Sequence, residues 1–326
     1  MPTVSEQKAV SEQKPVAEKP VPSSSGRLTL YLMDLMLKSP FRPELAVADG
    51  HLERSRKSMD RWGEIMPPLR GVTVAAGTIA GLYCETHTPK GAHSNQVLLY
   101  FHGGGFCLGS PRSHRNLASR LALEAGIRTV VPDYSKSPEH LFPHALEDTV
   151  RLYRHFLDQG IKPHNIVFAG DSAGGNLVLT TLLKLKQEGL PLPAAGCPIS
   201  PWCDVTLESD SMRDNASKDQ ILTPLLLQQF RDRYVNEEHW RNPLVSPVQA
   251  DFAGLPPLLI QVGSREVLLD DARRVAQSAA KAGVPVELEV WDGMQHVWHY
   301  SAFMLKDGKL ALRRIGQFLR DNIGKH

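Results

Sequence analysis

A serine stands among small residues in the segment GDSAGG at 170–175, where an apolar run, IVFA, passes directly into another, NLVLTTLL. This pattern is typical of a strand that turns sharply into a helix and exposes the serine hydroxyl on a strained backbone. A side chain at Gly170 or Gly174 would collide with the neighbouring strand and helix. We therefore predict that Ser172 is a nucleophile.

A glycine-rich segment, HGGGF at 102–106, follows the apolar run VLLYF. Successive glycines let backbone N–H groups approach a substrate oxygen closely, and in acyl transfer they hold the negative charge that develops on it. The alternative is a phosphate cradle, but the spacings G-x-G-x-x-G and G-K-[ST] are absent here. Because His102 precedes the glycines, we expect it to shape the loop by hydrogen bonding rather than to act as a base.

Short apolar runs alternate with helical patterns along most of the chain. Strands are expected over 97–101, 127–131, 166–169, 194–199, 257–262 and 286–291, and helices over 145–157, 173–187, 269–282 and 309–322 and before Gly126. Alternation of this kind predicts an α/β fold, a mostly parallel central sheet flanked by helices on both faces. Two further β-type runs, 72–75 and 79–86, predict a hairpin joined at Gly77 at a sheet edge.

Composition divides the chain into three parts. Residues 1–26, rich in Lys, Glu, Ser and Pro, are expected to form a disordered tail. Apolar residues at helical spacing predict N-terminal cap helices over 27–66, the second near 52–62. The catalytic domain is then 67–326, with a helical insertion at about 205–245 that adds to a cap over one end of the sheet.

Five segments together resemble the hormone-sensitive-lipase-like family of α/β-hydrolases. They are HGGGF at 102–106, YSKSPEHLFPHALED at 134–148, GDSAGG at 170–175, EVLLDD at 266–271 and GMQHVWH at 293–299. The resemblance runs from about residue 70 to the end and implies an α/β-hydrolase fold with a helical cap and the activity of a carboxylic ester hydrolase. It also allows a homodimer formed through the strand at 286–291 and its adjoining helix.

The same resemblance assigns catalytic roles by position. It implies that Ser172 is the nucleophile, that His296 is the general base and then acid, and that the backbone N–H groups of Gly103, Gly104 and Ala173 form the oxyanion hole.

The acidic partner of the histidine has two candidates. The family has a pattern resembling D-P-L-x-D after the penultimate core strand, and this chain has Glu266 and Asp270 in the first and last of those positions. We predict Glu266, because it directly follows the strand and lies between serine and histidine in the order of this fold. Asp270 is the alternative, and it and Asp271 are expected at the start of the next helix, where a carboxylate is favourable.

The resulting hypothesis is a two-step acyl transfer on short- to medium-chain acyl esters through an acyl-enzyme intermediate, with no cofactor. Phe106, Trp202 and Trp298 are the predicted substrate-binding side chains, with Leu108, Leu32 and Met36 as further candidates for the lining. Two alternatives stay open: hydrolysis of amides, lactones or small acetylated molecules by the same triad, and a non-catalytic, ligand-binding member of the fold.

Composition excludes several other classes of protein. The net charge of +2 is spread along the chain, so no nucleic-acid or stable membrane partner is expected, and the expected partner is a small-molecule ester. The four cysteines form no CxxC pair and lie in or beside apolar runs, which favours reduced, buried thiols. No apolar stretch is long enough to span a bilayer and the N-terminus lacks the apolar core of a signal peptide, so a cytoplasmic location is expected. His299 lies three residues after His296, but no third ligand has a suitable spacing, so no metal is predicted.

Overall fold

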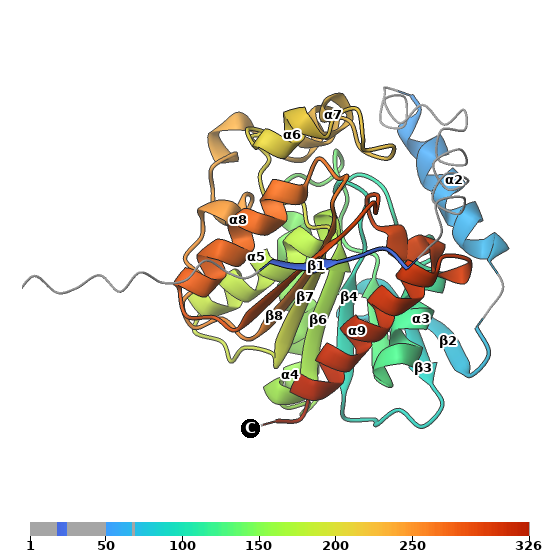
Figure 1. The fold of residues 1–326 in the computed structure, drawn as a ribbon. Coiled ribbons are helices and arrows are strands. Elements are labelled where there is room, and N and C mark those ends of the chain that lie inside the picture. The colour runs from blue at the N-terminus through green and yellow to red at the C-terminus, as the bar shows by residue number, and fades with distance from the viewer. Residues whose placement is uncertain (1–17, 25–49, 67–68, 326) are drawn as a thin grey trace, which may run out of the picture.

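The computed structural model describes residues 18–24, 50–66 and 69–325, and Figure 1 shows how they are arranged. Their strands form one nine-stranded sheet in the order β1-β9-β8-β7-β6-β4-β5-β3-β2. The strands are β1 (Glu18–Val21), β2 (Val72–Ile79), β3 (Leu82–Pro89), β4 (Val97–Phe101), β5 (Arg128–Pro132), β6 (Ile166–Asp171), β7 (Ala195–Ile199), β8 (Leu258–Gly263) and β9 (Val286–Trp291). The pairs β2–β3 and β3–β5 are antiparallel and the other pairs are parallel.

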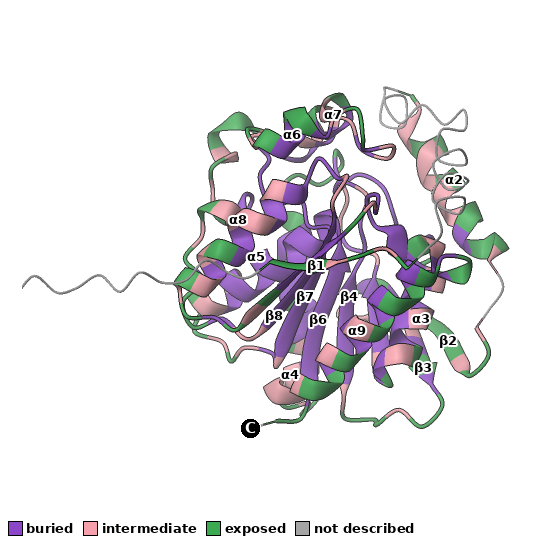
Figure 2. Cartoon of the chain, viewed as in Figure 1, coloured by how far each residue is buried: buried purple, intermediate pink, exposed green. Residues whose placement is uncertain are grey.

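Helices cover both faces of this sheet, so that the central strands are buried between them (Figure 2). The helices are α2 (Leu52–Ile65), α3 (Arg115–Ala125), α4 (His144–Asp158), α5 (Ala173–Gln187), α6 (Asp210–Asp214), α7 (Pro224–Tyr234), α8 (Leu269–Lys281) and α9 (Lys306–Asn322), with short 3-10 turns η2 (Pro163–Asn165), η3 (Glu237–His239), η4 (Pro247–Gln249) and η5 (Trp298–Phe303). The predicted α/β fold with a mostly parallel sheet is confirmed.

Strand β4 illustrates why the central strands are apolar throughout. Successive side chains of a strand point to opposite faces, and helices cover both faces here. Val97, Leu99 and Phe101 belong to the larger apolar core, which includes side chains of α4, α5 and α8. Leu98 and Tyr100 belong to the second core, which includes side chains of α3 and α9.

The hairpin predicted near the start of the sheet is present, but its turn lies elsewhere. Strands β2 and β3 pair from Val72 with Pro89 to Ile79 with Leu82, so the connection is Ala80-Gly81. Both connecting residues have positive φ, 52° and 79°, as a tight hairpin turn requires. The turn predicted at Gly77 is therefore wrong, and Gly77 lies inside β2 opposite Cys84.

Residues 18–24 overturn part of the predicted disordered tail. They add β1 to the sheet, parallel to β9. Glu18 accepts two hydrogen bonds from Arg273 at 2.6 and 3.0 Å, and Ser23 and Ser24 donate to the buried Asp307 at 2.6–2.9 Å. Composition did not reveal these contacts, because they depend on a sheet edge more than 250 residues away in sequence.

The position of β1 also bears on the predicted homodimer. Within the described residues β1 pairs with Leu288–Trp291, so this part of β9 has a neighbour on each side, β8 and β1. The homodimer predicted through the strand at 286–291 and its adjoining helix stays a prediction.

The cap is described in two parts. Helix α2 matches the second helix predicted within 27–66, whereas Leu32, Met36 and the rest of the first lie outside the described residues. The insertion expected at about 205–245 contains α6, α7 and η3, and Figure 1 shows α6 and α7 together beyond one end of the sheet.

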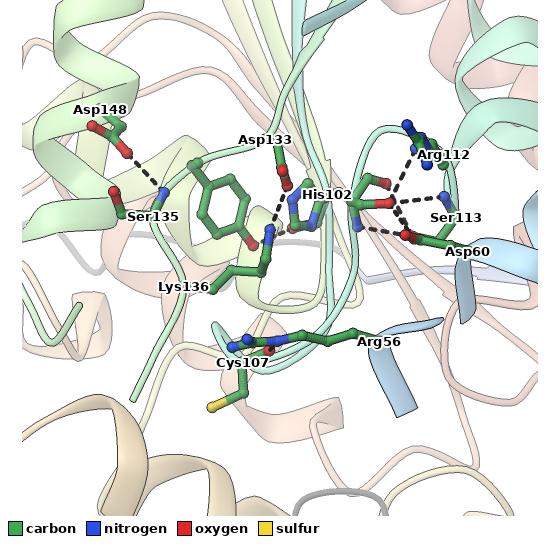
Figure 3. Close-up of polar contacts among 12 residues, drawn as sticks. Arg56, Asp60, His102, Cys107, Arg112, Ser113, Asp133, Ser135, Lys136 and Asp148 are labelled. Carbon is green, nitrogen blue, oxygen red and sulfur yellow. Dashed lines mark hydrogen bonds and ion pairs between the residues drawn. The ribbon is translucent and has the colours of Figure 1, made fainter. Parts of the chain in front are cut away.

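Arg56 holds α2 against two loops of the domain that contains the sheet (Figure 3). Its guanidinium donates to the Cys107 carbonyl at 2.8 Å, in the glycine-rich loop, and to the Ser137 carbonyl at 2.8 Å. It also makes two hydrogen bonds to Glu139 at 2.7 and 2.8 Å, which lower the pKa of that carboxyl to about 2. One turn later Asp60 accepts a hydrogen bond from the Ser110 hydroxyl, so the same helix contacts the far end of the glycine-rich loop.

We predict that Arg56→Ala lowers the free energy of unfolding by about 1–2 kcal/mol, because two carbonyls lose a charged donor and an ion pair disappears. Chemical denaturation followed by circular dichroism measures the change. Arg61→Ala, at an exposed position of the same helix, is the matched control and should leave stability unchanged. Equal stability of the two variants would show that Arg56 does not hold α2 in place.

Candidate active site

Ser172 lies in the turn that joins β6 to α5. Its backbone has φ 56° and ψ −119°, a strained conformation of the kind predicted. The turn brings backbones into close approach: a Cβ at Gly174 would lie 2.0 Å from the Phe101 carbonyl oxygen, and one at Gly170 would lie 2.6 Å from it. The predicted need for small residues on both sides of the serine is confirmed. The Ser172 side chain lines a cavity and has no hydrogen-bond partner among the described residues.

Glu266 and His296 are brought together by the loops that follow β8 and β9. His296 Nδ1 lies 2.8 Å from Glu266 Oε2, and because a carboxylate accepts, Nδ1 holds the proton and Nε2 is the free acceptor. The other carboxylate oxygen, Oε1, accepts from the Ser200 hydroxyl at 2.7 Å and from the Gly263 N–H at 2.6 Å. Glu266 has no solvent exposure. Its three hydrogen-bond donors, from His296, Ser200 and Gly263, compensate the cost of burying its charge.

The electrostatics of this pair favour a protonated imidazole. Burial is the largest single influence and lowers the pKa of His296, but the hydrogen bond and negative charge of Glu266, together with the charges of Asp219 and Asp171, raise that pKa above 6.5 overall. Burial raises the pKa of Glu266 above its usual 4.5, although the hydrogen bond with His296 opposes this change. Glu266 thus fixes the imidazole tautomer and stabilises its positive form.

The rival carboxylates are engaged elsewhere. Asp270 Oδ2 accepts from the Ser211 N–H at 2.8 Å, and its other oxygen pairs with Arg273. Asp271 is buried and accepts from the N–H groups of Cys203 at 2.8 Å and of Asp204 at 2.9 Å. Both lie in the first turn of α8, as expected, and neither is hydrogen-bonded to His296.

The glycine-rich loop corrects one predicted oxyanion donor. The Gly103 N–H donates to Asp171 Oδ1 and to His114 Nε2, both at 3.1 Å, so it is turned away from the cavity and its predicted role is wrong. Gly104 and Gly105 line the cavity beside Ser172. The N–H groups of Gly104, Gly105 and Ala173 donate no hydrogen bond to any residue that the structure describes.

Backbone conformation explains the shift by one residue. Gly104 and Gly105 have φ of 117° and 59°, so the chain reverses at these two residues. His102 shapes this loop as predicted: Nδ1 contacts the Gly103 carbonyl at 2.9 Å, and the ring stacks on Tyr134 at 4.1 Å. Three consecutive glycines are chemically identical in the sequence, so no sequence signal distinguished Gly105 from Gly103.

The cavity beside Ser172 has a volume of about 290 Å³ and mostly apolar walls. Two predicted substrate-binding residues, Trp202 and Trp298, line it, as does Leu108. Phe106 does not: it is fully buried behind the wall and stacks on Tyr234 with ring centroids 3.7 Å apart. The position predicted for Phe106 is therefore wrong.

Sequence reasoning named Leu32 and Met36 as cap residues of the lining and missed the cap wall that the described residues form. It consists of Met59 from α2, Ile221 and Leu222 before α7, and Leu226, Leu227 and Phe230 within α7. The available signal was the apolar stripe of α7 in an insertion that follows a core strand. That stripe alone does not tell a cavity wall from ordinary packing.

The described residues contain no group of three or more His, Cys, Asp or Glu side chains arranged to hold a metal ion. His299 is hydrogen-bonded to Gln261 Oε1 at 2.8 Å through Nε2.

All four cysteines are free and buried, which confirms the reduced thiols predicted from the sequence.

Residues 98–300 match a family described as having the alpha/beta hydrolase fold. The chain belongs to the α/β-hydrolases. A solved structure of an esterase from the bacterial hormone-sensitive lipase family is 39% identical to this hydrolase, with a TM-score of 0.86, and the match covers 92% of this chain and all of the other. The predicted family is thereby confirmed.

Two relatives agree with this assignment. The hydrolase is 42% identical to an acetyl-hydrolase of Streptomyces hygroscopicus over 85% of its own length and 92% of the relative's. It is 34% identical to an esterase of Acinetobacter venetianus over 88% of its own length and 95% of the relative's. The hydrolase is a serine carboxylic ester hydrolase, as predicted. None of the helices that the structure describes combines the length and apolar character needed to cross a bilayer.

Gly105 supports a prediction about the contact between the hydrolase core and its cap. A Cβ at this position would lie 2.4–2.6 Å from ring atoms of Phe230, so Gly105→Ala should lower the melting temperature. The loss of stability has two sources. An alanine at positive φ costs about 1–2 kcal/mol, and the clash of its methyl group with Phe230 costs about 1–3 kcal/mol.

Gly189→Ala is the matched control, because Gly189 has φ 65° and nothing within 4 Å of its added Cβ. It should therefore show the backbone cost alone. Adding Phe230→Ala to Gly105→Ala should recover part of the loss, since it makes room for the methyl group. Equal melting temperatures of Gly105→Ala and Gly189→Ala would show that α7 does not pack tightly against the glycine-rich loop.

Proposed function

We propose that Ser172, His296 and Glu266 catalyse the hydrolysis of uncharged short- to medium-chain acyl esters. The observation that carries the proposal is the buried 2.8 Å contact between Glu266 and His296, beside a cavity that also contains the strained Ser172. In free hydrolases the contact between nucleophile and base is often long and tightens with substrate bound, so an unpartnered serine hydroxyl is compatible with this role.

In the first step Ser172 Oγ attacks the ester carbonyl carbon while His296 Nε2 accepts the hydroxyl proton. Glu266 keeps the Nδ1 proton in place and stabilises the imidazolium. The carbonyl oxygen becomes negative, and the free N–H groups of Gly104, Gly105 and Ala173 are the donors proposed for it, with one such donor contributing about 3 kcal/mol to barrier lowering. When the tetrahedral species collapses, His296 returns the proton to the departing alcohol.

In the second step water attacks the acyl-enzyme and His296 takes its proton. The same N–H groups hold the second oxyanion. Collapse releases the carboxylic acid and returns the proton from His296 to Ser172 Oγ. No cofactor enters either step.

The cavity supports the proposed substrate class. Its volume of about 290 Å³ lies just below the usual range of ~300–1,000 Å³ for small-molecule sites. No lysine or arginine is among the described residues that line it. Apolar walls from α7 and two tryptophans favour an uncharged ester with a short acyl chain.

The decisive experiment measures hydrolysis of p-nitrophenyl esters with two to sixteen acyl carbons. We expect turnover to be highest on the short chains and to vanish in Ser172→Ala, which removes the attacking oxygen while circular dichroism and melting stay unchanged. Amide and lactone substrates tested in parallel decide whether the same triad acts more broadly. A folded wild-type protein that hydrolyses none of the esters would contradict the proposal.

The pH dependence tests the role of Glu266. The base must be neutral, and the His296 pKa lies above 6.5, so kcat/KM should fall as pH drops through a value above 6.5. Glu266→Gln keeps the shape but removes the negative charge that stabilises the imidazolium. The acid limb of the kcat/KM profile of Glu266→Gln should therefore move to lower pH, and the plateau of that profile should be lower than in wild type.

The control for this pH profile is Asp270→Asn, which removes the rival carboxylate and should leave the acid limb in place. The reverse result, a shift with Asp270→Asn and none with Glu266→Gln, would assign the acid to Asp270.

We also propose that the protein acts in the cytoplasm. Four free cysteines, all buried, suit a reducing compartment.

A further inference from the structure

The cap turn, which we define as residues 215–222 between α6 and α7, contacts both loops that carry the proposed acid and base. Figure 1 shows α6 and α7, which flank this turn, beyond one end of the sheet. The loops follow different strands, β8 and β9, and a third segment that binds both of them can set their relative position.

On the acid side the cap turn holds the backbone before and after Glu266. Asn215 Nδ2 donates to the Glu266 carbonyl at 2.8 Å and to the Ser264 carbonyl at 3.2 Å. Asp219 Oδ2 accepts from the N–H of Val267 at 3.0 Å. Contacts on both sides of Glu266 limit how far its side chain can shift.

On the base side the cap turn holds the residue before His296. Gln295 Oε1 accepts from the Gln220 N–H at 3.0 Å, and Gln295 Nε2 donates to the Lys218 carbonyl at 3.2 Å. The histidine loop is therefore fixed to the same few residues as the glutamate loop.

Asp219 is the residue that joins these contacts to the cavity wall. It is 5% exposed, and its Oδ1 accepts from the N–H groups of Ile221 and Leu222, both at 2.9 Å. Those two residues line the cavity. One buried carboxylate thus connects the wall of the substrate cavity to the loop of the acid.

We propose that Asp219 is a positioning residue for the triad: it couples the position of the cap turn to the alignment of Glu266 with His296. The inference rests on the proposed function of these two residues. Asp219 acts through the backbone of Val267 and through its charge, without a hydrogen bond to the imidazole.

The charge of Asp219 also acts on the imidazole. The titratable groups that interact electrostatically with His296 are Glu266 after β8, Asp219 in the cap turn, Asp171 at the end of β6 and His299 in η5, and His114 lines the same cavity. The three carboxylates raise the His296 pKa, with Glu266 contributing most of the three. Burial raises the pKa of Asp219 itself, while its three backbone donors and His296 oppose the change.

Asp219→Asn separates positioning from simple stability. An amide has one acceptor oxygen, so when it serves the N–H groups of the cap turn, its NH₂ group faces the Val267 N–H and that bond is lost. We expect kcat on p-nitrophenyl butyrate to fall roughly tenfold, a part of the ~10²–10⁴-fold that a well-placed general base contributes. KM should change less than kcat, and the acid limb of kcat/KM should move to lower pH.

The matched control is Asp271→Asn. Asp271 is also buried and also accepts backbone N–H groups, in its case those of Cys203 and Asp204, but it has no hydrogen bond to either triad loop. Its replacement should leave the acid limb unchanged. Asn215→Ala, which releases the two carbonyls near Glu266 without changing any charge, should lower kcat and serves as the deciding variant if Asp219→Asn does not fold.

A second readout is independent of turnover. An NMR titration of the His296 ring, assigned by the resonance missing in His296→Asn, should give a lower pKa in Asp219→Asn than in wild type. If wild type hydrolyses no ester, the proposed function fails, and this titration still decides whether Asp219 acts on His296.

The inference is overturned if Asp219→Asn lowers the melting temperature while kcat, the acid limb and the His296 pKa keep their wild-type values. It is also overturned if Asp271→Asn moves the acid limb as far as Asp219→Asn does.

Discussion

A fully buried carboxylate is stable only when donors surround it, and this requirement organises the site around Glu266. Its donors come from three places in the chain: a hydroxyl after β7, a backbone N–H at the end of β8 and an imidazole after β9. These strands are neighbours in the parallel sheet, so their carboxyl ends meet at one edge. The order of the strands is thus what permits a buried negative charge beside the histidine.

The serine obeys a different constraint, the close approach of backbones. The first turn of α5 lies against the end of β4, and only glycine at 174 leaves room for the Phe101 carbonyl. That contact fixes the start of α5 and, with it, the free N–H of Ala173. Gly104 and Gly105 follow the same strand β4. The contact between Gly174 and the Phe101 carbonyl therefore sets the position of Ser172 relative to the glycine-rich loop.

Residues whose position follows from local geometry were predictable from the sequence. Ser172 follows from the strand-turn-helix pattern, and Glu266 from its place directly after a strand. What failed depends on contacts between distant segments. Gly103 and Gly105 have the same side chain, and only the reversal of the chain decides which N–H faces the cavity.

Phe106 and the N-terminal strand failed for the same reason. An aromatic residue beside the glycines looks like a substrate contact, yet Tyr234, more than 100 residues later, buries it. Residues 18–21 have the composition of a disordered segment, and their structure comes from the hydrogen-bonding groups of β9. The fold class was predicted correctly because it follows from the repeated alternation of strand and helix, which does not depend on any single long-range contact.

Strand β1 has a consequence for how the molecule behaves at high concentration. An exposed sheet edge offers unpaired backbone groups on which other chains can stack and grow into aggregates. Among the described residues the outermost strand on this side has only four residues, EKPV, and includes two charges and a proline without an N–H group. Short length, charge and proline are features that make an edge a poor template. The sheet therefore ends on this side in a strand that resists further growth.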